Sequence, residues 1–381
     1  MRVSDLVEAI ESVAPTSLAE DWDRVGLQIG RPAAELSGPV LLTIDLTEEV
    51  AAEAIGMGAS AILAYHPPIF RGLDELTDAT AKGRILLGLI EKAVAVYSPH
   101  TALDAATGGV TDWLCEGVAG APSGRIAGDV RALTPDRSGG ARVKIVTFVP
   151  EADAEKVRNA MATAGAGQIG NYKVCSFATP GEGTFLGGAG TDPVVGHAGK
   201  LEQVPELRLE MVAPARSAAL VVETLREFHP YEEPPVDVYP LEPEPRRGIG
   251  AGRRLTLDSP ATLEQIGARL REHLRRSRLR FALPEGRADD EPFRTVGVVP
   301  GSGSELADTA IGEGCELFVT GEMKHHEVVG ATQRGLSILL AGHTNTERGY
   351  LSRLAPRLSG MLGGHEVRVS EKDRDPIRVL P

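Results

Sequence analysis

Apolar runs of strand length alternate with amphipathic segments of helix length in the first part of the chain. Residues 39–45 form an apolar run, residues 47–58 carry apolar positions at helical spacing, and residues 59–66 form a second run. Runs that are apolar on both faces are typical of strands in a parallel sheet covered by helices. The pattern predicts a β-α-β unit, then a strand within residues 91–100 and a helix that begins near residue 110.

The same alternation returns near the other end of the chain. Residues 293–300, 315–321 and 336–343 are predicted strands, separated by segments at helical spacing, and a helix is predicted from about Asn345. Each strand ends in a polar or Gly-containing turn. In open α/β sheets, ligands bind at the carboxyl ends of strands, so residues that follow these strands are candidates for function.

A different pattern lies between these two parts. The order of predicted elements over residues 141–241 is β-α-β followed by β-α-β with Gly-rich connections, which is typical of a ferredoxin-like α+β unit. Stretches rich in Pro, Gly and Arg border it, at residues 134–140 and 242–252. We therefore predict an α/β protein with a discontinuous outer domain of mainly parallel strands, residues 1–140 and 242–381, and a domain inserted at 141–241.

Composition and charge exclude some classes of function. The formal net charge of −13, from 40 basic and 53 acidic residues, argues against nucleic acid or an anionic membrane surface as the main partner. The three cysteines lie far apart without CxxC spacing, which predicts neither a disulfide framework nor a thiolate zinc site. The first residues place acids on a helical pattern, and no apolar run reaches membrane-spanning length, so we expect a cytoplasmic protein.

Histidine and carboxylate side chains follow three of the predicted strands. His66 ends one strand, His100 and Asp104 follow another, and His343 and Glu347 stand where a third turns into a helix. Residues four apart in a first helical turn can point the same way. Imidazole with carboxylate and no thiolate suits zinc, manganese or iron, and a bridging carboxylate can hold two ions about 3.5–4 Å apart. Each signal alone also fits a hydrogen-bonded structural histidine, but the shared position at strand ends favours a metal site.

Longer motifs carry a resemblance to a known family. They are "WDRVGLQIG" (22–30), "AYHPPIF" (64–70), "SPHTALDAATGGVTDWL" (98–114), "HPYEEPPVDVYPL" (229–241) and "TGEMKHHEVVGATQRGLSILLAGHTNTE" (320–347). In this order they resemble the Nif-three-like family, dinuclear-metal hexameric proteins also described as GTP cyclohydrolase I type 2 homologues. The resemblance implies a ring-shaped homohexamer with metal centres facing an internal cavity, and an insert similar to the small trimeric domains of the PII/CutA group.

The resemblance also implies a ligand set for two divalent ions. His66 and Asp104 would hold one ion, His343 the other, and Glu347 would bridge both. The family pattern reads His-His-Pro where this chain has Tyr65, His66 and a proline, so Tyr65 stands at a ligand position of the ion that His343 binds.

Three outcomes follow for the second ion. It is held with the help of His100, it is held with Tyr65 as phenolate, or it is weak or absent. A neutral phenol, whose pKa is near 10, is a poorer donor than imidazole unless a metal lowers that pKa. We prefer His100, because it lies only four residues before Asp104.

Other residues are candidates for catalysis or substrate contact. His325 and His326 match the family motif and suit proton transfer or substrate contact, although capping or a hydrogen bond to a metal ligand explains them equally well. Glu322 has the same two interpretations. Gly301 and Gly303 lie between a predicted strand and helix, where backbone N–H groups can bind phosphate. The commoner reason for such glycines is the turn itself.

Two classes of function are consistent with these residues. The first is a metal-dependent hydrolase acting on a nucleotide or another phosphate-containing small molecule, although no residue in the sequence points to guanine. The second is a non-enzymatic hexamer that binds metal or a partner protein, with the insert as a sensing or docking module. Tyr65 favours the second class, because loss of a ligand affects two-metal catalysis more than metal binding.

Overall fold

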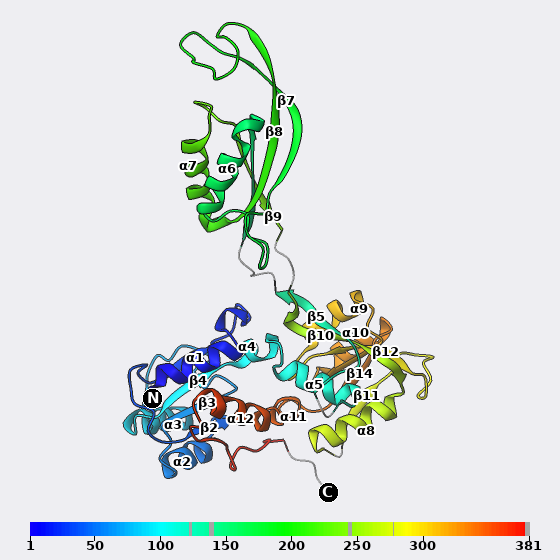
Figure 1. Cartoon of the computed structure of the whole chain (residues 1–381). Helices are drawn as coiled ribbons and strands as arrows, with labels where there is room; N and C mark the ends of the chain where they lie inside the picture. The colour runs from blue at the N-terminus through cyan, green and yellow to red at the C-terminus, as the bar shows by residue number, and fades with distance from the viewer. Residues whose placement is uncertain (122–123, 137–140, 243–245, 277, 378–381) are drawn as a thin grey trace. The chain divides into compact units, whose positions relative to one another are not determined.

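The computed structural model describes residues 1–121, 124–136, 141–242, 246–276 and 278–377. The chain divides into two compact units (Figure 1). Unit 1 comprises Met1–Asp136 and Arg246–Pro381, and unit 2 comprises Arg137–Pro245. Of the two stretches interpreted as borders of the insert, residues 137–140 and 243–245 lie outside the described residues.

The first sheet of unit 1 has five strands, four of them with parallel neighbours. Its order is β1 (Gly26–Ile29), β4 (Ala95–Ser98), β3 (Ala61–Ala64), β2 (Val40–Thr43) and β15 (Val367–Val369). Only β1 pairs antiparallel, with β4. Helices α2 (Glu48–Gly56) and α3 (Ala81–Glu91) cover one face through a small apolar cluster that includes Val50 and Leu86. Both faces of the central strands are therefore buried, as the apolar runs predict.

The second sheet of unit 1 is mixed. Its order is β11 (Arg280–Ala282), β14 (Ser337–Leu340), β13 (Leu317–Thr320), β12 (Phe293–Val298), β10 (Arg246–Ala261) and β5 (Gly128–Asp136). Strands β12, β13 and β14 are parallel, whereas β11, β10 and β5 pair antiparallel with their neighbours. The prediction of mainly parallel strands therefore holds for the centre of this sheet and is wrong for its edges.

Strands β5 and β10 are the main difference from the sequence prediction. Residues 246–252 were interpreted as a linker because they are rich in Arg and Gly, but they belong to β10. The physical reason lies at Arg253, whose side chain is fully buried. Its guanidinium donates to the carbonyls of Gly250, Gly252, Ala105 and others and pairs with Asp112. A buried arginine is tolerated when its donors are satisfied, and composition alone does not reveal such partners.

One large apolar core joins the two sheets of unit 1. It contains buried residues from both sheets, such as Leu63 and Val319. It also contains residues from helices α1 (Val3–Val13), α5 (Val110–Ala119), α8 (Leu263–Leu274) and α12 (Leu351–Met361). Three short helices complete the connections at strand ends: α4 (His100–Ala105), α9 (Ala307–Gly312) and α11 (Asn345–Arg348). The shared core holds the loops that follow β3, β4 and β14 in one rigid frame.

Unit 2 is a four-stranded antiparallel sheet with two helices on one face (Figure 1). Its elements follow the order β6 (Arg142–Val149), α6 (Glu151–Thr163), β7 (Phe177–Leu186), β8 (Leu201–Pro214), α7 (Ala218–Phe228) and β9 (Val236–Leu241). The sheet order is β7-β8-β6-β9. Strands β7 and β8 form a long antiparallel hairpin, in which Phe177 pairs with Glu210 at one end and Leu186 pairs with Leu201 at the other. Among the described residues of the whole chain, no helix combines the length and apolarity needed to span a membrane.

Candidate metal centre

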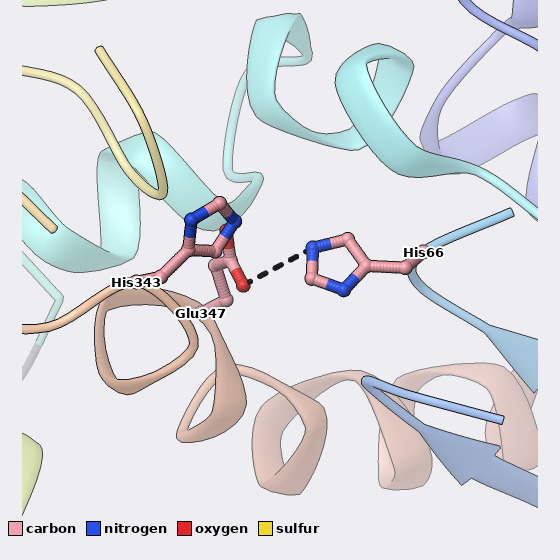
Figure 2. Close-up of side chains that lie close together, drawn as sticks. All are labelled: His66, His343 and Glu347. Atoms are coloured by element: carbon pink, nitrogen blue, oxygen red, sulfur yellow. Dashed lines mark ion pairs between the residues drawn. The ribbon is translucent and has the colours of Figure 1, made fainter. Parts of the chain in front are cut away.

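Three side chains from two different sheets converge in unit 1 (Figure 2). His66 lies two residues after β3, His343 follows β14, and Glu347 lies on α11. The turn after β14 requires glycine at position 342, where φ is +88° and a Cβ atom would lie 2.4 Å from Asn345 Nδ2. This turn directs the chain from the strand into α11, so His343 and Glu347 face the same side.

The ligand atoms of these three residues lie within 4.8 Å of one another. His66 Nε2 is 3.5 Å from Glu347 Oε2, and His343 Nε2 is 3.6 Å from Glu347 Oε1. We call His66, His343 and Glu347 the histidine side of the centre. Two imidazole nitrogens and one carboxylate form a donor set that suits a divalent transition metal.

Each of the three histidines at the strand ends has its Nδ1 against a carboxylate. The Nδ1–O distances are 2.8 Å from His66 to Asp45, 2.9 Å from His343 to Glu322, and 2.8 Å from His100 to Asp23. When Nδ1–H donates to the carboxylate, Nε2 keeps its lone pair and the ring orientation is fixed. This arrangement is typical of metal-ligating histidines.

The hydrogen bonds from the histidines keep two of these carboxylates, Asp23 and Asp45, ionised. Burial raises the pKa of Asp23, but the hydrogen bonds from His100 and Thr101 outweigh it, and the pKa lies below its usual value. Burial also raises the pKa of Asp45, and the hydrogen bond from His66 with the nearby charge of Arg348 reverses the shift. Both aspartates therefore stay charged and act as acceptors at neutral pH.

Glu347 is a buried carboxylate whose surroundings favour a bound cation. Its side chain is only 3 % exposed, and Oε2 has no hydrogen-bond partner among the described residues. Burial, followed by the negative charges of Asp104 and Asp45, raises its pKa well above the usual value. Gly301 closes over the carboxylate, since a Cβ atom there would lie 2.6 Å from Glu347 Oε1. A buried carboxylate without a partner is costly, and a divalent ion between it and the two imidazoles would supply that partner.

The other side of the centre is closed by a hydrogen bond. Tyr65 Oη donates to Asp104 Oδ1 at 2.6 Å; Tyr65 is buried and Asp104 is half-buried. Burial and the charge of Asp104 raise the pKa of Tyr65 well above its usual value, and burial raises the pKa of Asp104 to about 6. We call Tyr65, Asp104 and His100 the tyrosine side. The phenol is a donor to Asp104, which is the opposite of the phenolate ligand considered from the sequence.

His100, on the tyrosine side, also lies close to His66 of the histidine side. Its ring centroid is 5.4 Å from that of His66 and 5.5 Å from that of Tyr65. Its backbone adopts φ +29°, an uncommon value for a residue other than glycine. Backbone strain of this kind is concentrated at functional sites.

Comparisons with known proteins agree with this geometry. Residues 1–376 match the family Duf34/NIF3 (NGG1p interacting factor 3). The chain belongs to the Duf34/NIF3 family.

Relatives in this family cover the chain almost completely. A "GTP cyclohydrolase 1 type 2 homolog" of Halalkalibacterium halodurans is 34% identical over 98% of both chains. The human "NIF3-like protein 1" is 33% identical over 100% of this chain and 93% of its own. Among solved structures, a Bacillus cereus protein related to NIF3 is 32% identical with a TM-score of 0.69, and a Staphylococcus aureus protein is 25% identical with a TM-score of 0.77. Each covers 100% of this chain and is itself covered to 99%. The family resemblance found in the motifs is therefore confirmed.

The ligand set carried over from Duf34/NIF3 proteins is brought together only in part. His66, His343 and Glu347 form one group, whereas Asp104 is bound to Tyr65. His325 and His326 are exposed at the start of α10 (His325–Gln333), and neither lines the pocket at the centre. Their catalytic role stays a prediction. For Glu322 the structure favours the hydrogen bond to a ligand, His343.

For Gly301 and Gly303 the structure favours the turn over the phosphate site that was the weaker interpretation. The N–H of Gly301 donates to Thr346 Oγ1 at 2.8 Å, and the N–H of Gly303 donates to Thr320 Oγ1 at 3.1 Å. Donors that are already satisfied by buried hydroxyl groups are not free for a phosphate. Gly301 instead allows close approach of the loop to Glu347 and His343, and Gly303 allows close approach to Val299 and Thr320.

Asp45 and Asp23 were missed as functional residues of this Duf34/NIF3 chain. Asp45 follows β2, which is the parallel neighbour of β3, so the same rule that selected His66 would have selected it. Asp23 lies within the motif "WDRVGLQIG", but no spacing in the sequence links it to His100, which is 77 residues away. Only the tertiary structure gives that pairing.

Proposed function

We propose that this protein is a divalent-metal-dependent hydrolase that acts on a nucleotide or another phosphate-containing small molecule. The observation that carries the proposal is the buried Glu347 carboxylate, which faces two imidazoles and whose Oε2 has no hydrogen-bond partner among the described residues. Each imidazole is oriented by its own carboxylate. Such a donor set suits an ion that has coordination positions left for water and substrate, because the three side chains fill only three of these positions.

Each residue of the centre has its own role in the proposed hydrolysis. His66, His343 and Glu347 would hold the ion, which when bound would supply Lewis acidity and lower the pKa of water. His100 lines the same pocket, and its Nδ1 faces Asp23, so its Nε2 is available as a proton acceptor. Asp23 fixes the ring orientation and stabilises the imidazolium that forms when His100 takes a proton. Gly301 and the buried loop after β12 limit access of bulk water to Glu347.

A second divalent ion is proposed on the tyrosine side, where Asp104 and His100 are the available ligands. The second ion has to replace the hydrogen bond from Tyr65 Oη to Asp104, so we expect it to bind more weakly than the first. Zinc, manganese and iron all suit the donor set. In the form with one ion, His100 stays free to accept a proton.

The substrate class rests on the family and on the metal centre. Relatives carry the name "GTP cyclohydrolase 1 type 2 homolog", which supports nucleotides as the first compounds to test. Hydrolysis of a phosphoester or phosphoanhydride uses the same groups, since an ion polarises the scissile bond and His100 handles the proton.

The test is a hydrolysis assay on the full chain loaded with zinc or manganese. GTP, other nucleotides and a phosphodiester are assayed with wild type, Glu347→Gln and His100→Gln. We expect Glu347→Gln to lose both ion and turnover, and His100→Gln to keep the ion and lose turnover by about 100-fold, a typical contribution of general base catalysis. His197→Gln, an exposed histidine of unit 2, is the matched control and keeps wild-type turnover. Turnover that survives in Glu347→Gln contradicts the mechanism.

The alternative function is a non-enzymatic metal-binding or partner-binding protein. The hydrogen bond between Tyr65 and Asp104 favours it, because this bond removes a carboxylate from a centre with two ions. A metal-loaded protein that hydrolyses none of the compounds, in wild type and in Tyr65→His, supports this alternative.

We further propose, from the family resemblance, that the chain assembles as a ring-shaped homohexamer in the cytoplasm. In the same way we propose that unit 2 is an inserted ferredoxin-like domain similar to the PII/CutA group. Its antiparallel sheet with two helices on one face supports this assignment. Light scattering on the purified full chain gives the mass, and a mass other than six chains contradicts the proposed assembly.

A further inference from the structure

A pocket of about 220 Å³ opens from the metal centre of unit 1. Glu347, His343 and Asp104 line its inner end, and Trp22, Glu20 and Glu305 line it as well. Ligand pockets for drug-sized molecules occupy about 300–1,000 Å³. The volume therefore suits a single small ring system next to the metal ion and leaves the rest of a larger substrate outside.

Trp22 presents an aromatic surface at this pocket. Its side chain is 49 % exposed, although large aromatic side chains are usually buried. Phe70 and His100 hold the indole in edge-to-face contacts, with ring centroids 6.0 Å and 6.1 Å away. These contacts fix the ring orientation while half of the side chain stays accessible. An exposed, positioned indole is a stacking surface for a flat ligand.

The charges around Trp22 are negative. Glu20 and Glu305 are both exposed, and neither forms an ion pair with a basic side chain in the part of the chain that the structure describes. Burial and then the charge of Glu305 raise the pKa of Glu20, so the two carboxylates lie close enough to interact. No Lys or Arg is among the described residues that line the pocket. A phosphate group therefore has no protein cation to bind here, whereas N–H donors meet two acceptors.

We propose that Trp22, Glu20 and Glu305 bind a planar nitrogen heterocycle that carries N–H donors, with the group to be hydrolysed directed toward His343 and Glu347. The ring stacks on the indole of Trp22, and its N–H groups donate to the two carboxylates. A phosphate on the same substrate reaches only the metal ion, because the rest of the pocket repels it. This inference rests on the proposed hydrolase and names the end of its substrate that the chain recognises.

Fluorescence of the zinc-loaded full chain tests this inference directly. The chain has two tryptophans, and the other one, Trp113, is buried, so quenching reports mainly on Trp22. The probes are adenosine, guanosine and cytidine, which lack phosphate, together with inorganic phosphate and tetramethylammonium. We expect at least one nucleoside to quench the fluorescence, and phosphate and tetramethylammonium to leave it unchanged.

Variants then assign the binding to the three residues, with calorimetry as the readout. Trp22→Ala weakens nucleoside binding about 5- to 150-fold, the factor expected from loss of one base-stacking contact. Trp22→Phe keeps an aromatic face and retains most of the affinity. Glu20→Gln and Glu305→Gln each weaken binding by about 3- to 10-fold, because a charged acceptor becomes neutral. Glu285→Gln, an exposed glutamate outside the pocket, is the matched control and binds like wild type.

Four outcomes overturn the inference: no nucleoside binds, Trp22→Ala binds as well as wild type, phosphate alone quenches Trp22, or tetramethylammonium binds in place of the nucleosides. Failure of the hydrolase is separate. If nucleosides bind through Trp22 and no nucleotide is turned over, the recognition stands and the hydrolase fails. If nucleotides are turned over and Trp22→Ala leaves KM unchanged, the hydrolase stands and the recognition fails.

Discussion

The two sides of the centre contain similar residues in different states. On the histidine side, His66 and His343 face the buried carboxylate of Glu347, whose Oε2 accepts no hydrogen bond from the part of the chain that the structure describes. On the tyrosine side, the equivalent carboxylate of Asp104 is satisfied by a phenol at 2.6 Å. A phenol can donate a hydrogen bond to a carboxylate that would otherwise need a metal ion as its partner. The tyrosine at position 65 therefore changes whether Asp104 requires an ion. The difference teaches that the residue types alone do not define a metal site. Whether the carboxylate already accepts a hydrogen bond also has to be known.

Removing the carboxylate of the histidine side should have the largest effect. We expect elemental analysis to give one tightly bound ion per chain in wild type and none in Glu347→Gln. The metal-free variant should melt at a higher temperature than metal-free wild type, because an amide avoids the cost of a buried, unpaired charge. Glu285→Gln serves as the control. One zinc per chain in Glu347→Gln would show that the histidine side is not the metal site.

Changing the tyrosine side should add a second ion. Tyr65→His replaces the donor to Asp104 with a ligand, and we expect tightly bound metal to rise from one to two ions per chain. Tyr65→Phe removes the hydrogen bond without adding a ligand and should stay at one tight ion. If wild type already holds two ions with equal affinity, the proposed inequality of the two sides is wrong.

The pH dependence of stability should separate the metal-free and metal-bound forms. Burial raises the pKa of Asp104 to about 6, above its value in the unfolded chain, so the folded state binds this proton more tightly. Protonated Asp104 contributes up to about 3 kcal/mol to the free energy of unfolding. This contribution is complete below the unfolded pKa near 4 and is lost as pH rises through about 6.

Chemical denaturation between pH 4 and 7 measures this effect. Glu347 changes stability in the same direction, because its pKa is also raised. Metal-free Asp104→Asn should show a smaller decrease with pH than metal-free wild type. Zinc should oppose the decrease, because the ion favours the charged carboxylate of Glu347. An equally steep decrease in Asp104→Asn is the result that speaks against the raised pKa.

Substituting the carboxylates that accept from the histidine Nδ1 atoms should weaken zinc binding moderately on the histidine side and hardly at all on the tyrosine side. Asp45→Asn and Glu322→Gln should each weaken zinc binding about 10- to 100-fold, because each orients a ligand imidazole. Asp23→Asn should leave tight zinc binding almost unchanged and lower turnover, since its partner His100 is outside the tight site. Competition with a fluorescent chelator gives the affinities. Equal losses in all three variants would place His100 among the ligands of the first ion.

The smallest effect on zinc binding is expected for Asp373, which acts through Arg348 and Asp45. Arg348 forms an ion pair with Asp373 and lies 4.0 Å from Asp45, which in turn orients His66. Asp373→Asn should weaken zinc binding by roughly two- to fivefold, less than the 10- to 100-fold of a direct partner. The same chelator competition measures it. A loss as large as that of Asp45→Asn would mean that Asp373 holds the whole loop in place, which a melting curve would also reveal.

Part of this centre is predictable from local patterns, and part of it is not. His66 and His343 follow apolar runs whose strands are parallel in the structure, so the strand-end rule applies to both. The pairing of β5 with β10 was missed, because Arg253 finds its partners on α5 and in loops far along the chain. The sequence left two interpretations open for the glycine turn, and the structure favours the turn itself, because hydroxyl groups of Thr346 and Thr320 already occupy its N–H groups.

By itself, the sequence determined the order of most elements, the family, and the residues from which a metal site could be built. It could do so because apolar periodicity and strand-end position are local properties of the chain. Only the tertiary structure decided the state of each residue. Tyr65 and Asp104 are 39 residues apart, and His66 and Asp45 are 21 apart, yet both pairs lie within 3 Å. A hydrogen bond depends on distances of a few tenths of an ångström, and those are set by the packing of strands and helices around the shared core.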